Sequence, residues 1–298
     1  MAAAAVVLGL LPTTLSLAGC STAEIGLLAL RRPILALLLA TGAPSVSPIR
    51  AFEYREPFHM LRGGIVGFKA IFKLHESWAM ALVFLQYFLV LGATANLIQV
   101  SWELGSQTVI SFSSDSSYHP LLWYLFTLVI HTFGTLTVYL RVSLRFDSNP
   151  LLPATDWKVR PLVYGIWAKV CQEFKLSGHQ SVVELRLRKE MTLFFLFSWI
   201  TSTGTIVHII YGTIIFSGTL FIGTQDALLI VFRYFLSTVI CRIILMMEIS
   251  GMRQNTKVFE LIENDGVPLV EQGPATYSNR VPTADRGSIK EVELVDGK

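Results

Sequence analysis

The sequence predicts an all-α polytopic membrane protein, a four-transmembrane-helix bundle with interfacial amphipathic helices. Three observations predict this fold: the apolar composition, four long uncharged runs, and the alternation of basic residues between those runs. Of the 298 residues, 52% are hydrophobic and 15% are charged, whereas soluble domains carry about 25% charged residues. The expected partner is therefore a lipid bilayer, and the net charge of only +3 gives no reason to expect nucleic acid.

Four apolar runs are long enough to cross a bilayer, which takes about 20 helical residues. We place the spans at residues 77–100, 120–140, 191–216 and 227–247, and together they define a membrane domain over 77–247. The last two spans are joined by the short connector 217–226, which predicts a transmembrane hairpin.

Basic residues fall on alternate sides of these spans. Lys and Arg number five in residues 50–76, none between the first two spans, nine in the loop 141–190, none in the connector 217–226 and six from Glu248 onward. Because Lys and Arg accumulate in cytoplasmic loops, we expect the loop 141–190 and the C-terminus in the cytoplasm. The type of membrane is not predicted.

Two basic segments outside the spans have apolar residues at helical spacing. Residues 50–76 carry Leu61, Ile65, Phe68 and Phe72 beside lysines and arginines, a pattern typical of a helix on a membrane surface. The stretch 163–174 in the long loop has a similar face. In both, packing on another part of the protein is an equal alternative. The tail 248–298 lacks apolar periodicity, and we expect most of it to be disordered.

The N-terminal apolar segment, residues 1–49, has several interpretations. It could be a signal sequence or a fifth span, and its Leu17-Ala18-Gly19-Cys20 stretch fits a lipoprotein box that lacks the usual basic region before it. The Arg31-Arg32-Pro33 break, with few acidic residues around it, also fits a mitochondrial presequence. The charge pattern favours an uncleaved segment with its N-terminus outside, or one that does not cross.

Four polar residues lie at similar depth in the outer half of the predicted spans: Asn96, His131, His208 and Arg233. An arginine at this depth costs about 2.5–3.5 kcal/mol, so it needs a partner or a role. One interpretation is close helix packing, with Gly204 and Gly212 one turn on either side of His208. Another is that His131 and His208 are axial ligands of one b-type haem, and a third is a proton or anion path through Arg233.

Motifs for enzymes and metal sites are absent from the sequence. There is no HExxH, GxSxG or Walker lysine loop, and the cysteines have no paired spacing. We therefore expect a non-enzymatic membrane component without a cofactor: an adaptor, a small carrier or a channel-like oligomer, partnered by copies of itself or by another membrane protein. The alternative function is a b-type haem electron carrier that uses His131 and His208.

The stretch FSGTLFIGTQDALLIVFRYFLSTVICRIILMMEISG, residues 216–251, resembles uncharacterised multi-pass membrane proteins of filamentous fungi. The resemblance extends over the region of the four spans. It implies a eukaryotic membrane and a multi-pass fold, and it implies no activity.

Overall fold

The computed structural model describes residues 2–47, 75–113, 117–146, 172–180, 183–188, 191–254 and 256–259. The described chain is mostly helical, and four helices are long and apolar enough to cross a membrane. These helices are α6 (Glu76–Gln107), α7 (His119–Arg141), α9 (Thr192–Ser217) and α10 (Thr224–Gln254). The prediction of a helical fold with four long apolar helices is thus confirmed.

Two of these helices extend beyond the predicted spans. Helix α6 continues from residue 100 to Gln107, and α10 continues from residue 247 to Gln254. The sequence limits were set where charged side chains begin. Glu103 and Glu248 both form ion pairs with arginines, so neither charge ends its helix.

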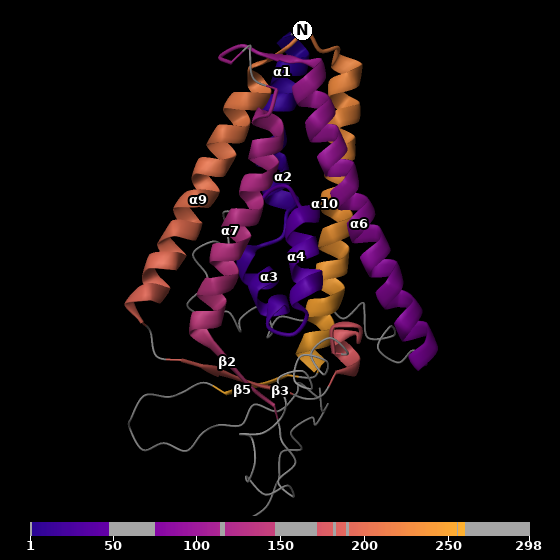
Figure 1. The fold of residues 1–298 in the computed structure, drawn as a ribbon, viewed down its shortest axis with the longest axis vertical. Coiled ribbons are helices and arrows are strands. Elements are labelled where there is room, and N and C mark those ends of the chain that lie inside the picture. Colours follow the sequence, from indigo (N-terminus) through magenta and orange to yellow (C-terminus); the bar gives the residue numbers. More distant parts are fainter. Residues whose placement is uncertain are drawn as a thin grey trace, which may run out of the picture.

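The two ends of the bundle have different structures (Figure 1). At one end, here called the hairpin end, β1 (Val109–Ile110) after α6 pairs antiparallel with β4 (Thr219–Leu220) before α10. At the other, here called the sheet end, β3 (Val183–Leu187) lies between the antiparallel β2 (Val142–Phe146) and the parallel β5 (Thr256–Phe259). The long helices converge toward the hairpin end and spread apart toward the sheet end.

Four short N-terminal helices fill the space between the long ones (Figure 1). They are α1 (Ala2–Gly9), α2 (Leu11–Ala18), α3 (Thr22–Ala29) and α4 (Pro33–Gly42). Helix α1 contacts α9 and α10, α3 contacts α7, and α4 contacts α6. Each spans only about 12–15 Å at 1.5 Å per residue, so none crosses a bilayer alone.

Local sequence explains where these short helices begin. The Ser21 side chain accepts a hydrogen bond from the backbone N–H of Glu24, whose carboxylate accepts one in return from the N–H of Ser21. This capping box starts α3. Pro33 starts α4, because proline lacks the N–H that a first helical turn leaves unbonded. A Cβ on Gly19 would lie 2.6 Å from the Ser45 carbonyl oxygen, so glycine lets the returning chain approach.

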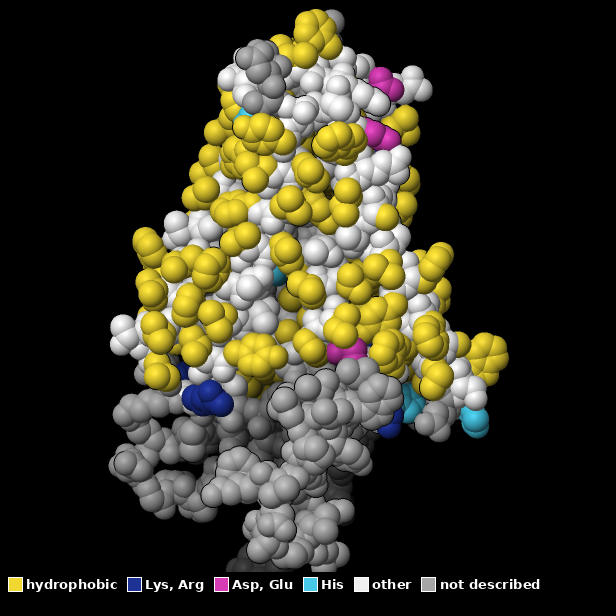
Figure 2. All heavy atoms as spheres, viewed as in Figure 1, with side chains coloured by type: hydrophobic (Ala, Val, Ile, Leu, Met, Phe, Trp, Pro, Cys, Tyr) yellow, Lys and Arg dark blue, Asp and Glu magenta, His cyan; other side chains and the backbone are white. Residues whose placement is uncertain are grey.

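Apolar side chains form both the interior and the outside of the bundle. The core includes Leu27 and Leu39 from the N-terminal helices together with Val90 of α6 and Ile244 of α10. Large apolar side chains also cover most of the face of the long helices shown in Figure 2. In a soluble protein such a continuous apolar surface is rare.

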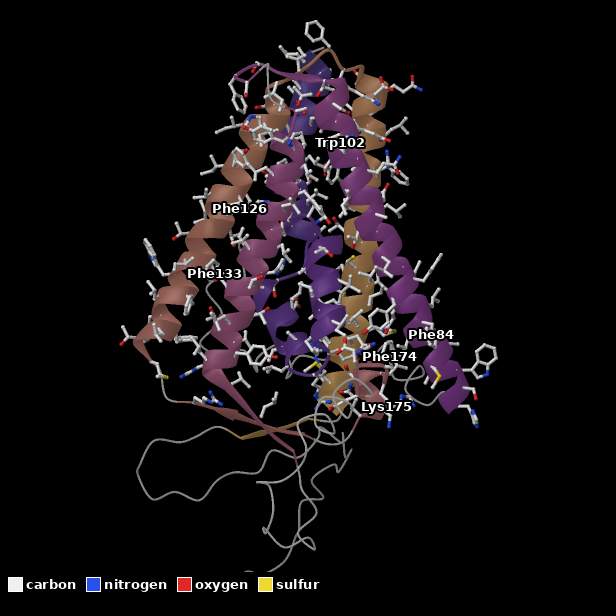
Figure 3. All side chains as sticks on the ribbon, in the orientation of Figure 1. Phe84, Trp102, Phe126, Phe133, Phe174 and Lys175 are labelled. Carbon is white, nitrogen blue, oxygen red and sulfur yellow. The ribbon has the colours of Figure 1, made fainter. Side chains whose placement is uncertain are left out.

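The predicted surface helices fall mostly outside the described residues, as does the tail beyond residue 259. One end of the loop segment 163–174 is described. There the Phe174 ring lies 6.5 Å from that of Phe84 and 5.6 Å from that of Tyr87, both on α6 (Figure 3). This end of the segment therefore packs on a long helix.

Candidate functional site

The four polar residues that the sequence places at similar depth lie in two separate places. Asn96 of α6 and Arg233 of α10 are hydrogen-bonded to each other. His208 of α9 bonds instead to residues of α7, the helix that carries His131. Similar depth in the spans was therefore not enough to predict which side chains meet. Depth does not specify which neighbouring helix each side chain faces.

Arg233 joins α10 to α6 through its guanidinium. Its Nε donates to Asn96 Oδ1 at 2.8 Å, and its Nη1 lies 2.8 Å from Glu103 Oε2. Glu103 Oε1 accepts a second hydrogen bond from Gln99 at 2.7 Å. Asn96 Nδ2 in turn donates to Ser237 Oγ at 2.9 Å. The side chains of Arg233 and Glu103 are 32% and 35% exposed, so the ion pair is accessible from outside the bundle.

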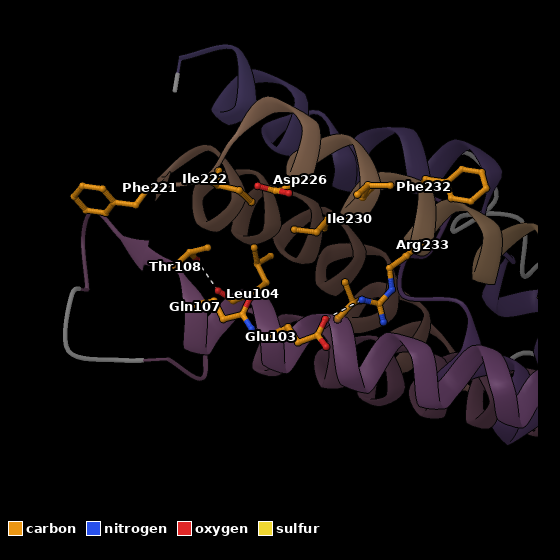
Figure 4. A pocket seen from close by; sticks show the side chains of 12 residues that line it. Glu103, Leu104, Gln107, Thr108, Phe221, Ile222, Asp226, Ile230, Phe232 and Arg233 are labelled. Carbon is orange, nitrogen blue, oxygen red and sulfur yellow. Dashed lines mark hydrogen bonds and ion pairs between the residues drawn. The ribbon is translucent and has the colours of Figure 1, made fainter.

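This ion pair lines a cavity of about 390 Å³ between α6 and the start of α10 (Figure 4). The cavity lies toward the hairpin end. Its polar lining residues include Gln107 and Asp226, and its apolar lining includes Leu229 and Phe232. Leu229 and Phe232 are also exposed on the outside of the bundle, so the cavity opens sideways onto an apolar surface.

The histidines belong to a packed aromatic cluster. The Trp123 ring lies parallel to the His208 ring, with centroids 4.9 Å apart and an interplanar angle of 6°. Trp123 Nε1 donates to the His208 carbonyl oxygen at 3.1 Å. A Cβ on Gly212 would lie 2.3 Å from Trp123 Nε1. The glycine beside His208 therefore makes room for a tryptophan of the neighbouring helix.

The hydrogen bonds of His208 assign its tautomer. His208 Nε2 lies 3.0 Å from the Trp123 carbonyl oxygen, which can only accept, and 3.1 Å from Thr127 Oγ1, which already donates to the Pro44 carbonyl. Nε2 must therefore carry the proton. Within the described part of the chain, His208 Nδ1 and both ring nitrogens of His131 have no hydrogen-bond partner.

These surroundings do not fit a haem held between His131 and His208. One face of the His208 ring is covered by Trp123, and its Nε2 is protonated and turned to α7. A Cβ on Gly204 would make an ordinary van der Waals contact with Ile130 at 3.5 Å, so only a small space lies beside this glycine. A macrocycle would have to displace these side chains.

A second polar site, at the sheet end, was missed in the sequence analysis. The side chains of Arg32 and Glu248 are both 0% exposed, and Arg32 Nη1 lies 2.8 Å from Glu248 Oε1. Gln86 donates to the same Oε1 at 2.6 Å, and the Ser177 hydroxyl donates to Oε2 at 2.6 Å. The carboxylate thus joins four segments of the chain: the α3–α4 turn, α6, α10 and the turn η6 (Ser177–His179).

Glu173 extends this buried network. Its backbone carbonyl accepts a hydrogen bond from Arg32 Nε at 2.9 Å. Its Oε1 accepts from the Leu35 backbone N–H and from the Tyr87 hydroxyl, each at 2.8 Å. These hydrogen bonds connect the turn between α3 and α4 to the long helices.

A third ion pair joins α10 to the N-terminal helices. Arg242 bonds to the Glu24 carboxylate in a bidentate arrangement, with Nη2 at 3.2 Å from Oε1 and Nη1 on Oε2. From the sequence we would place Arg242 near the lipid phosphates and pair Glu248 with basic residues of the loop. Both bond instead to residues of the N-terminal segment, which we did not place inside the bundle.

One signal in the sequence could have indicated these pairs. Glu24 and Arg32 are charges inside an apolar segment, and charges at that depth must pair. Their partners lie more than two hundred residues away, in α10. The sequence does not indicate which of the distant charged residues is the partner of each.

Within the described ranges, no group of three or more His, Cys, Asp or Glu side chains could hold a metal ion. No protein-family model, no curated protein and no solved structure matches the chain. The residues themselves are therefore the basis for a functional proposal.

Proposed function

We propose that the protein is a non-enzymatic multi-pass membrane carrier with its binding site at the Arg233–Glu103 ion pair. In this proposal α6, α7, α9 and α10 cross the bilayer. The hairpin end faces outward, and the sheet end, with the tail, faces the cytoplasm. Four long apolar helices, their exposed apolar side chains and the charge alternation of the loops support this arrangement.

The observation that carries the proposal is the position of the ion pair. Charged groups within membrane helices are costly, and where they persist they mark pathways and sites for polar ligands. Arg233 and Glu103 are one third exposed and line a cavity of about 390 Å³. The Arg32–Glu248 pair, by contrast, is fully enclosed and connects several segments of the chain.

Topology is tested first, with a reporter fused after Lys298 and protease added to intact cells. We expect the reporter to be protected, and we expect a tag inserted in the connector 217–226 to be cleaved. A reporter cleaved from outside would overturn the orientation and with it the placement of the cavity in the outer leaflet.

Transport is tested with purified protein in vesicles. Light scattering follows the entry of small zwitterionic, cationic and anionic solutes, and dithionite quenching follows the crossing of a fluorescent phospholipid. We expect faster movement of one of these classes than in empty vesicles, and Arg233→Ala should abolish it while expression stays normal. Unchanged flux in the variant would contradict the carrier proposal, and lost expression alone would assign Arg233 to packing.

The alternative function, a b-type haem electron carrier, is tested by the visible spectrum of the same purified protein. A Soret band that disappears in both His131→Ala and His208→Ala would support the haem carrier. Its absence would remove that alternative. The close packing of Trp123 on His208 favours the second result.

A further inference from the structure

We infer that the cavity between α6 and α10 binds a membrane phospholipid with a primary ammonium headgroup, such as phosphatidylethanolamine. The inference rests on the proposed membrane insertion and names the ligand of the proposed site. It follows from three features of the cavity: its unbalanced charge, its sideways opening, and its depth in the bundle.

The charged side chains that line the cavity leave one negative charge unbalanced. Glu103 and Arg233 neutralise each other at 2.8 Å. Asp226 also lines the cavity, and no other described residue forms a hydrogen bond or an ion pair with its carboxylate. Asp226 lies in the first turn of α10, and its side chain is exposed. A cation is therefore the favoured occupant.

Asp226 and Arg233 are placed to hold the two charges of one headgroup. They are seven residues apart on α10, which puts them on the same side of the helix, about 10 Å apart along its axis. Both lie at the cavity in Figure 4. Arg233 uses Nε and Nη1 on α6, so Nη2 is left to donate to a phosphate. A primary ammonium can donate hydrogen bonds to the Asp226 carboxylate, which a quaternary one cannot.

The shape of the cavity favours a lipid over a small soluble amine. Part of its lining is apolar and includes Val100, Leu229 and Phe232. Phe232 and Leu229 are 60% and 58% exposed on the outer surface of the bundle. The cavity therefore opens where the acyl chains of lipids would lie. Its two carboxylates, Glu103 and Asp226, lie near the ends of α6 and α10, at the depth of headgroups, and Arg233 lies about two turns further along α10.

The experiment measures thermal unfolding of the full chain in detergent, with phosphatidylethanolamine, phosphatidylcholine or phosphatidylglycerol of the same acyl chains added. We expect phosphatidylethanolamine to raise the unfolding temperature most and phosphatidylglycerol least. Asp226→Asn should weaken its apparent affinity by about tenfold or more, since a charge-assisted hydrogen bond is lost. The matched control Asp226→Glu, which keeps the charge, should retain the preference.

Equal stabilisation by the three lipids, or an unchanged preference in Asp226→Asn, would overturn the inference. Free ethanolamine that protects as well as the lipid would also overturn it, in favour of a soluble amine. The vesicle assay keeps this result apart from the proposed function. Lipid binding without transport would remove the carrier and leave the lipid site, whereas transport without lipid preference would remove only the lipid site.

Discussion

Two ion pairs at opposite ends of the bundle differ in how far they are enclosed. Arg32 and Glu248 at the sheet end are 0% exposed, and among the described residues they bond to each other, to Gln86 of α6, and to Glu173 and Ser177 of the long loop. Arg233 and Glu103 at the hairpin end are about one third exposed and face a cavity. The same kind of ion pair is thus enclosed by the chain at one end and lines an open cavity at the other.

The Arg242–Glu24 pair lies between these extremes, with side chains 23% and 8% exposed. All three pairs have one member on α10. Replacing each of the three arginines with methionine therefore allows a direct comparison. The loss of stability in each variant can be related to how far its ion pair is enclosed.

Arg32→Met should have the largest effect. It leaves the Glu248 carboxylate charged and enclosed, which costs about 3–5 kcal/mol of unfolding free energy. Unfolding in detergent, followed by circular dichroism, measures the loss. The double variant Arg32→Met with Glu248→Met should recover much of the stability, since an apolar pair leaves no charge unpaired. Wild-type stability in the single variant would show that the pair does not hold the fold.

Arg242→Met should cost less, about 2 kcal/mol. Glu24 would lose its bidentate partner, although it would keep the hydrogen bond from the Ser21 backbone N–H. The same unfolding measurement applies. A loss as large as that of Arg32→Met would mean that exposure does not rank the pairs.

Gly212→Ala tests the packing of α7 on α9. The added Cβ would lie 2.3 Å from Trp123 Nε1 and 2.8 Å from Pro12 Cγ, so we expect a loss of about 1–3 kcal/mol. The control is Gly92→Ala in α6, where a Cβ meets nothing within 4 Å. It should leave stability unchanged or raise it by about 0.4–1 kcal/mol. Equal effects in the two variants would contradict the close packing of Trp123.

Arg233→Met should have the smallest effect on stability, because water and lipid headgroups can solvate the exposed Glu103 carboxylate. Its unfolding temperature should stay closest to that of the wild type among the three arginine variants. Ligand binding and transport should nevertheless be lost. Unfolding at a much lower temperature would assign this pair to the fold as well.

The four long helices could be predicted from the sequence because a long apolar run has few other stable structures. Their ends could not, since Glu103 and Glu248 extend their helices by pairing with arginines from other segments. For the site, the sequence identified Asn96 and Arg233 as polar residues of similar depth. It did not identify Glu103, or the separation of His208 from them.

The sequence by itself determined the helical class, the number of long apolar helices and the residues that need polar partners, because these depend on local hydropathy and helical rise. Only the tertiary structure decided that the N-terminal helices lie inside the bundle and which charge pairs with which. The physical reason is that enclosed charges pair through space, between helix faces brought together by packing. The packing decides which faces of two helices meet, and it can bring together residues as far apart in the sequence as Arg32 and Glu248.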